Sequence, residues 1–185
     1  MIDNIPRGIS SQPSHSFHLV RCHPLGIVKL NFDGSLSNSS AIGGFILCDW
    51  TGKVLRLGAA FYGTTSILVA EARALREGVA ATCQVGFHHL IIEGNNKIVI
   101  HALDGAIQIP WSIQYIIKDI FAWREQGVAF AIKHIFREAN MAAESLSKFG
   151  HSLVGSFTTD FCFSPDLRVI LGDDIVGHTL VRRGV

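Results

Sequence analysis

Apolar and polar residues alternate in the first regular segment of the chain, with the two-residue period of a β-strand. In the segment IVKLNFDGS, Val28, Leu30 and Phe32 fall on one face, and the polar residues between them fall on the other. Two further apolar segments, AIGGFILCDW and KVLRLGAAFYG, meet at a turn over residues 49–52. This pattern predicts three strands joined by turns, which form an antiparallel meander.

The period changes to that of an α-helix beyond the third strand. Apolar residues recur at helical spacing from Ser66, a suitable N-cap, to about residue 81. The elements predicted after this helix are, in chain order, a strand at residues 88–94, helices at residues 96–103 and 111–124, a strand at residues 128–136, and a helix from Asn140 to Lys148 with Gly150 at its stop position. Strands reached through helices indicate an α/β fold, with a five-stranded mixed sheet and helices packed on it.

Domain boundaries follow from the same pattern. Residues 26–150 hold all the predicted elements and are expected to form one domain. Serines and prolines interrupt any period in residues 1–25, which are expected to be a flexible lead-in. Residues 151–185 are expected to be a C-terminal tail that packs loosely on the domain or is disordered.

Composition narrows the class of protein. The 185 residues are 48% hydrophobic and 17% charged, which favours one packed core over a disordered chain. A net charge of +1 disfavours tight nucleic-acid binding by the whole surface and leaves only a local basic strip for it. The four cysteines have no zinc-ligand spacing, and the sequence has neither a secretory h-region nor an apolar run of about 20 residues. We therefore expect an intracellular protein without membrane contact, in either the cytoplasm or the nucleus.

Four short strings place a chemically useful side chain at or near the end of a predicted element. They are NFDGS with Asp33, AEARAL with Glu71, IIEGNNK with Asn95, and REANMAAESL with Glu144. Hydrolysis of phosphodiesters by two divalent ions needs such a cluster of oxygen ligands. The asparagine at the third position contributes no negative charge to that cluster.

In order and spacing, these strings resemble the ribonuclease H-like domain of plant retroelement reverse transcriptases, and the similarity covers residues 27–150. The resemblance implies a ribonuclease H-like fold and metal-dependent endonucleolytic cleavage of RNA in RNA–DNA hybrids, with two Mg²⁺ or Mn²⁺ ions. It implies catalytic roles at the four motif positions, Asp33, Glu71, Asn95 and Glu144, the three acidic ones as metal ligands. The family carries aspartate where this chain has Asn95 and Glu144. We expect Asn95 to impair cleavage.

The resemblance also bears on three further residues, and Lys97 is expected beside them on the site side as part of a modest basic strip. His134 lies ten residues before Glu144, where related ribonucleases H have a loop histidine that assists product release; the strand sequence AIKHIF favours a packed or surface histidine instead. Arg137 and Asn140 match an Arg-x-x-Asn signature of the family. Asn140 is expected to cap the last helix, and Arg137 to hold its loop or touch a phosphate. Lys97, Arg137 and Asn140 are the expected nucleic-acid contacts.

Each ligand position also has an ordinary structural interpretation, which the sequence leaves open. Asp33 can be a turn residue before glycine, Glu71 a helix former, and Asn95 a turn and capping residue. Glu144 can favour the helix dipole and pair with Lys148, four residues later. The function is open in the same way between a hybrid-cleaving enzyme, an inactive domesticated module that binds hybrid or RNA, and a protein-interaction domain. The oligomeric state is not predicted.

Overall fold

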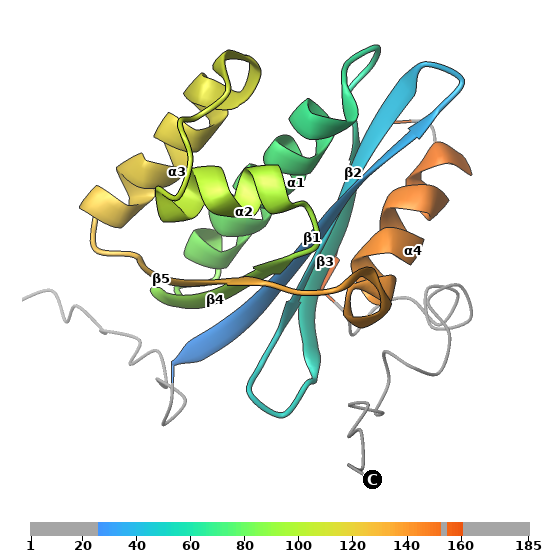
Figure 1. The fold of residues 1–185 in the computed structure, drawn as a ribbon. Coiled ribbons are helices and arrows are strands. Elements are labelled where there is room, and N and C mark those ends of the chain that lie inside the picture. The colour runs from blue at the N-terminus through green and yellow to red at the C-terminus, as the bar shows by residue number, and fades with distance from the viewer. Residues whose placement is uncertain (1–25, 153–154, 161–185) are drawn as a thin grey trace, which may run out of the picture.

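A six-stranded mixed sheet lies at the centre of the computed structural model, which describes residues 26–152 and 155–160 (Figure 1). The strands in chain order are β1 (Ile27–Ser37), β2 (Ser40–Cys48), β3 (Val54–Phe61), β4 (His89–Gly94), β5 (Ala129–His134) and β6 (Phe157–Asp160). In space the order is β5-β4-β1-β2-β3-β6. β1 is therefore an inner strand, antiparallel to β2 and parallel to β4.

Helices cover the sheet on both faces. The α-helices are α1 (Ile67–Gln84), α2 (Lys97–Asp104), α3 (Gln114–Glu125) and α4 (Met141–Phe149), and the short 3₁₀ helices are η1 (Trp111–Ile113), η2 (Arg137–Ala139) and η3 (Gly150–Ser152). Figure 1 shows α1, α2 and α3 on one face and α4 on the other. No helix within the described ranges is long and apolar enough to cross a membrane.

The alternation in β1 decides which of its side chains face α1. Leu30 and Phe32 are buried on this face and belong to the same core cluster as Leu75 of α1. Burying side chains of this size stabilises a fold by about 1.5–3 kcal/mol each. A smaller cluster beneath α4 contains Ile46 of β2 and Leu146 of α4. The polar residues of β1 point toward this second face, which places them next to α4.

The sheet has one strand more than the five that the sequence predicts, so that count is wrong. β6 pairs antiparallel with β3, with Phe157 opposite Ala59. The ring of Phe157 also meets the ring of Phe149 edge-on, with 6.3 Å between centroids. The four residues FTTD show no alternation that would reveal a strand, and the strand that they pair with lies about 100 positions earlier in the chain.

The expected lead-in at residues 1–25 and most of the expected tail, residues 153–154 and 161–185, lie outside the described residues. The domain boundaries therefore stay a prediction. Within the described part, β6 adds a strand of the sheet beyond residue 150.

The helix ends depend on tertiary contacts as well as on local sequence. Ser66 caps α1 as predicted, since its side chain accepts a hydrogen bond from the Val69 backbone N–H at 3.3 Å. Gly150 does not stop α4 with a left-handed backbone; at φ −55° the chain continues into η3. A side chain at Gly150 would collide with Ile42 of β2. Glycine is needed there for the close approach of helix and sheet.

Candidate active site

Asp33 lies on β1 where two helices come close to the strand. Its register partner on β2 is Gly44, at which an added Cβ would lie 2.7 Å from the backbone nitrogen of Ser147 in α4. An added Cβ at Gly34 would lie 2.7 Å from the backbone nitrogen of Glu71 in α1. Any side chain at either glycine would push a helix away. The two glycines therefore bring α1 and α4 up to the Asp33 position.

Glu71 is a buried carboxylate, only 5% exposed. Burial raises the pKa of Glu71 to about 8, the negative charge of Asp33 adds to the increase, and hydrogen bonds from the Asn96 side chain and the Gly34 backbone oppose it. Its Oε2 atom has no hydrogen-bond partner among the described residues. Buried polar atoms are nearly always paired, so this oxygen calls for a functional explanation.

Asp33 is also buried, and its pKa is raised to about 6. Burial is the largest cause; the hydroxyl of Ser147, which donates to Asp33 Oδ2 at 2.6 Å, lowers the pKa, and the charge of Glu144 raises it. Two neighbouring buried carboxylates that both resist ionisation form a site that a cation would stabilise.

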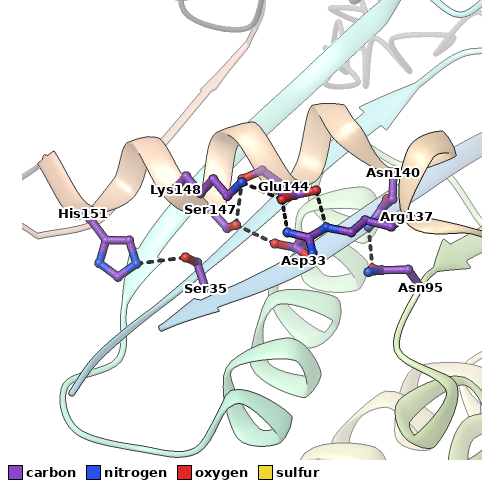
Figure 2. A network of polar contacts seen from close by, with 9 residues as sticks. All are labelled: Asp33, Ser35, Asn95, Arg137, Asn140, Glu144, Ser147, Lys148 and His151. Atoms are coloured by element: carbon purple, nitrogen blue, oxygen red, sulfur yellow. Dashed lines mark hydrogen bonds and ion pairs between the residues drawn. The ribbon is translucent and has the colours of Figure 1, made fainter. Parts of the chain in front are cut away.

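Glu144, on α4, has the opposite environment (Figure 2). Arg137 donates to both of its carboxylate oxygens, with Nε 2.9 Å from Oε2, and Lys148 Nζ lies 2.6 Å from Oε1. The hydrogen bond from Arg137 and then that from Lys148 lower the pKa of Glu144 to about 2. The pair with Lys148 at four residues' spacing is present as expected from the sequence. Both oxygens of Glu144 are thus already bound to cations of the chain itself.

Asn140 links β1 to the loop after β4 from a fully enclosed position. Its Nδ2 donates to the Phe32 carbonyl oxygen (2.8 Å) and to Asn95 Oδ1 (2.9 Å), and its Oδ1 accepts from Asn31 Nδ2 (3.2 Å). The predicted side-chain cap of α4 is wrong, because the Asn140 amide makes its hydrogen bonds to these buried groups instead. The backbone carbonyl of Asn140 still accepts a hydrogen bond from the Glu144 N–H in the first turn of α4, at 3.1 Å. A contact with nucleic acid stays a prediction for this 1% exposed residue.

His134 ends β5, and its Nε2 lies 3.2 Å from the backbone oxygen of Asn95. The two residues are therefore neighbours, although a part in product release stays a prediction. Lys97 is exposed at the first position of α2, directly after the Asn96 cap. Arg137 has a side chain 67% exposed, so one face of its guanidinium reaches solvent while it holds Glu144.

A match along the sequence decides the family. The family model described as "Reverse transcriptase-like" matches residues 31–150, which is more than half of the chain and includes all four motifs. The chain belongs to this reverse transcriptase-like family.

Relatives and solved structures agree with that assignment. An Arabidopsis thaliana protein with a provisional ribonuclease H name is 24% identical over 162 residues, 86% of this chain, and this chain spans only 26% of that protein's length. Ribonuclease H1 of the archaeon Halobacterium salinarum is 22% identical, with a TM-score of 0.64, over 68% of this chain and 98% of that chain. LC11 ribonuclease H1 in complex with an RNA/DNA hybrid is 21% identical, with a TM-score of 0.62, over 66% and 94%. The fold of this reverse transcriptase-like domain is therefore that of ribonuclease H.

Two residues of this reverse transcriptase-like domain join the site without being singled out by the motifs. Ser147 contacts Asp33, and its position three residues after Glu144, on one helix face, is a signal that could have found it. Asn31 bonds Asn140 and lies two residues before Asp33, on the same face of β1. In both cases the helix or strand period, applied to polar residues, would have placed the residue on the same face as a motif residue.

The residues present fit a divalent ion at one place in this reverse transcriptase-like domain. Asp33 and Glu71 offer hard oxygen ligands, and Glu71 Oε2 has no hydrogen-bond partner in the described part of the chain, which suits Mg²⁺ or Mn²⁺. Glu144 and Asn95 do not present free carboxylate oxygens, because the first is bound by Arg137 and Lys148 and the second is neutral and bound by Asn140. No group of three or more acidic, histidine or cysteine side chains in the described ranges is arranged to hold a metal.

Proposed function

We propose that this domain binds RNA–DNA hybrids and cuts their RNA strand by metal-dependent hydrolysis, slowly because Asn95 stands at a ligand position. The observation that carries the proposal is the buried pair of Asp33 and Glu71, with one Glu71 oxygen unpaired within the described residues. An unpaired buried oxygen costs folding free energy, so its presence is best explained by a ligand that it binds. A divalent cation is the ligand that two carboxylates favour.

The chemistry follows from what three of the four motif residues, Asp33, Glu71 and Asn95, can contribute. A divalent ion held by Asp33 and Glu71 would supply activation of a water molecule and stabilisation of the oxygen that leaves the phosphodiester. With an ion bound, Asp33 and Glu71 would ionise and supply negative charge from β1 and α1, which approach each other closely at Gly34. Asn95 supplies an amide oxygen without charge. At an effective dielectric near 20, one unit charge about 4 Å from a divalent ion is worth roughly 8 kcal/mol before desolvation. Even after strong discounting, this loss supports slow turnover.

An RNA–DNA hybrid is the proposed substrate because of the folds that this chain resembles. LC11 ribonuclease H1 was solved with an RNA/DNA hybrid, and so was the foamy viral protease–reverse transcriptase, which is 15% identical with a TM-score of 0.56. Proteins recognise such duplexes through backbone shape and the RNA 2′-hydroxyls, with little sequence readout. The exposed cations Lys97 and Arg137 are available for the backbone, in keeping with a chain of only +1 net charge.

The test is cleavage of a hybrid whose RNA strand carries an end label, with the 185-residue chain in excess and Mn²⁺ or Mg²⁺ present. We expect slow cutting by the natural chain, at least tenfold faster cutting by Asn95→Asp, and none by Asp33→Asn. The matched control is Asn38→Asp in the β1–β2 turn, where φ is +47° and an aspartate is tolerated. This control makes the same chemical change away from the site.

The outcomes separate an enzyme from a binding module. Cutting that requires Asp33 and rises only with Asn95→Asp supports the proposal. If the natural chain and Asn95→Asp both bind the hybrid and leave it uncut, the proposal is wrong and the domain is a binding module. Equal gains from Asn95→Asp and Asn38→Asp would overturn the assigned role of Asn95.

A further inference from the structure

The side of α4 that faces Asp33 presents a hydroxyl and an occupied carboxylate. Ser147 Oγ lies 2.6 Å from Asp33 Oδ2 and 2.9 Å from the Glu144 backbone oxygen, and Ser147 is completely buried. A hydroxyl that donates to a carboxylate takes up one of its lone pairs. The atom of α4 that contacts Asp33 is therefore a hydrogen-bond donor, which does not leave that edge of the carboxylate to a metal ion.

The Glu144 carboxylate points into a cluster of opposite charges. Figure 2 shows Arg137 and Lys148 converging on its carboxylate from η2 and from the next turn of α4. Arg137 makes a two-pronged contact with both oxygens, the geometry in which arginine binds carboxylates most strongly. Glu144 and its two cations together carry a net charge of +1, counted over these three groups. A divalent ion would have to displace both and approach against that charge.

The opposite situation exists at Glu71. Its Oε2 is unpaired within the described residues, and the residue is 95% enclosed by the fold. No cationic side chain is among the groups that affect its pKa. Among the described residues, Glu71 therefore has no cationic partner, whereas Glu144 is already paired with two cations.

We propose that this domain binds a single divalent ion, at Asp33 and Glu71, and that Arg137 and Lys148 hold Glu144 out of the ligand set. The proposal deepens the proposed function and rests on it for the identity of the site, although ion binding is measured without any nucleic acid. Glu144 is thereby a positioning residue, which fixes Arg137 and the loop around η2. Release of Glu144 from its two cations would open a second ion position.

The first experiment counts Mn²⁺ ions bound to the 185-residue chain by electron paramagnetic resonance of the free ion, with calorimetry as a second measurement. We expect one ion per natural chain and none for Asp33→Asn. The decisive variant is the double change Glu144→Gln with Lys148→Gln, which removes the carboxylate and keeps the local charge at +1. We expect it to bind one ion with an affinity within threefold of the natural chain. A loss of tenfold or more would show that Glu144 is a ligand and overturn the proposal.

The second experiment releases Glu144 by Arg137→Gln with Lys148→Gln. We expect this variant to bind two ions, while Lys118→Gln with Arg124→Gln on α3, the matched loss of two exposed cations, binds one. Circular dichroism checks that each variant is folded. One ion in the released variant would overturn the role of the two cations, and two ions in the natural chain would overturn the whole inference. If the natural chain binds one ion and neither it nor Asn95→Asp cuts a hybrid, the inference stands and the proposed function fails. If the natural chain cuts the hybrid and binds two ions, the proposed function stands and the single-ion inference fails.

Discussion

Glu71 and Glu144 are chemically identical side chains on helices that cover opposite faces of the same sheet, and both lie beside Asp33, yet their partners and their pKa values differ. Glu71 is enclosed beside Asp33, one of its oxygens has no partner among the residues that the structure describes, and its pKa is raised to about 8. Glu144, whose side chain is 14% exposed, is held by two largely exposed cations, and its pKa is lowered to about 2. Burial with a like charge thus keeps one carboxylate unsatisfied, while opposite charges satisfy the other. A motif match alone gives both residues the same role.

Whether a carboxylate can bind a cation therefore depends on the groups that already contact it. Glu71 approaches Asp33 because Gly34 leaves no side chain between strand and helix. Glu144 lies beside the same site, yet its carboxylate is already bound by Arg137 from η2. The α1 side is therefore destabilised and ready for a cation, whereas the α4 side is stabilised and closed. Three substitutions test this contrast through stability, in order of decreasing effect.

Glu71→Gln tests the destabilised side and has the largest expected effect. The folded-state pKa of about 8 lies above the ordinary 4.5, so the stability from the neutral carboxyl is complete below pH 4.5 and lost as the pH rises through 8. Glutamine mimics the neutral form. With a chelator present, we expect the variant to match the natural chain near pH 4.5 and to be more stable above pH 8, by at most about 5 kcal/mol.

Urea unfolding across that pH range measures the effect. Glu125→Gln, at an exposed glutamate that ends α3, is the matched control. A constant difference between Glu71→Gln and the natural chain at all pH values would show that Glu71 is not held neutral by the fold. The claim that Glu71 is destabilised, in contrast to Glu144, would then be wrong.

Asn140→Ala tests the connection between the two sides. Asn140 makes hydrogen bonds to Phe32 and Asn31 of β1 and to Asn95 after β4, and it directly precedes α4. Alanine leaves these buried groups without partners, so we expect a loss of about 2–4 kcal/mol in the free energy of unfolding. Urea unfolding measures it, with Gln114→Ala on the exposed face of α3 as the control. A loss below about 1 kcal/mol would mean that water replaces the amide readily, and that the network does not join the two sides.

The same residue shows where prediction from sequence stops. The order of strands and helices from residue 27 to 150 follows from periodicity, because each element carries its own apolar pattern. The Asn140 network does not, since its partner Phe32 is 108 positions away in the chain. A local pattern makes asparagine before a helix a cap, and a distant buried carbonyl takes its side chain instead. β6 is missed for the same reason.

The two glutamates divide in the same way. The contact of Glu144 with Lys148 is local and visible as an i,i+4 spacing, whereas Arg137 reaches Glu144 only because η2 turns the chain back. The burial of Glu71 depends on Gly34 in another element. Motif order predicts which residues gather, and packing decides their charge state. The charge state in turn decides which of them can bind a cation.

Arg137→Gln tests the stabilised side and has the smallest expected effect on folding. Its guanidinium is largely in solvent, so water and salt screen the ion pair, and Lys148 still holds Glu144. We expect a change in the urea midpoint no larger than that of Arg76→Gln, which breaks the exposed pair with Asp119. The two variants should converge as salt is raised. A midpoint loss comparable with that of Asn140→Ala would mean that the cluster at Glu144 organises the fold as well as closing the carboxylate. The contrast with Glu71 would then be one of architecture rather than of ligand access.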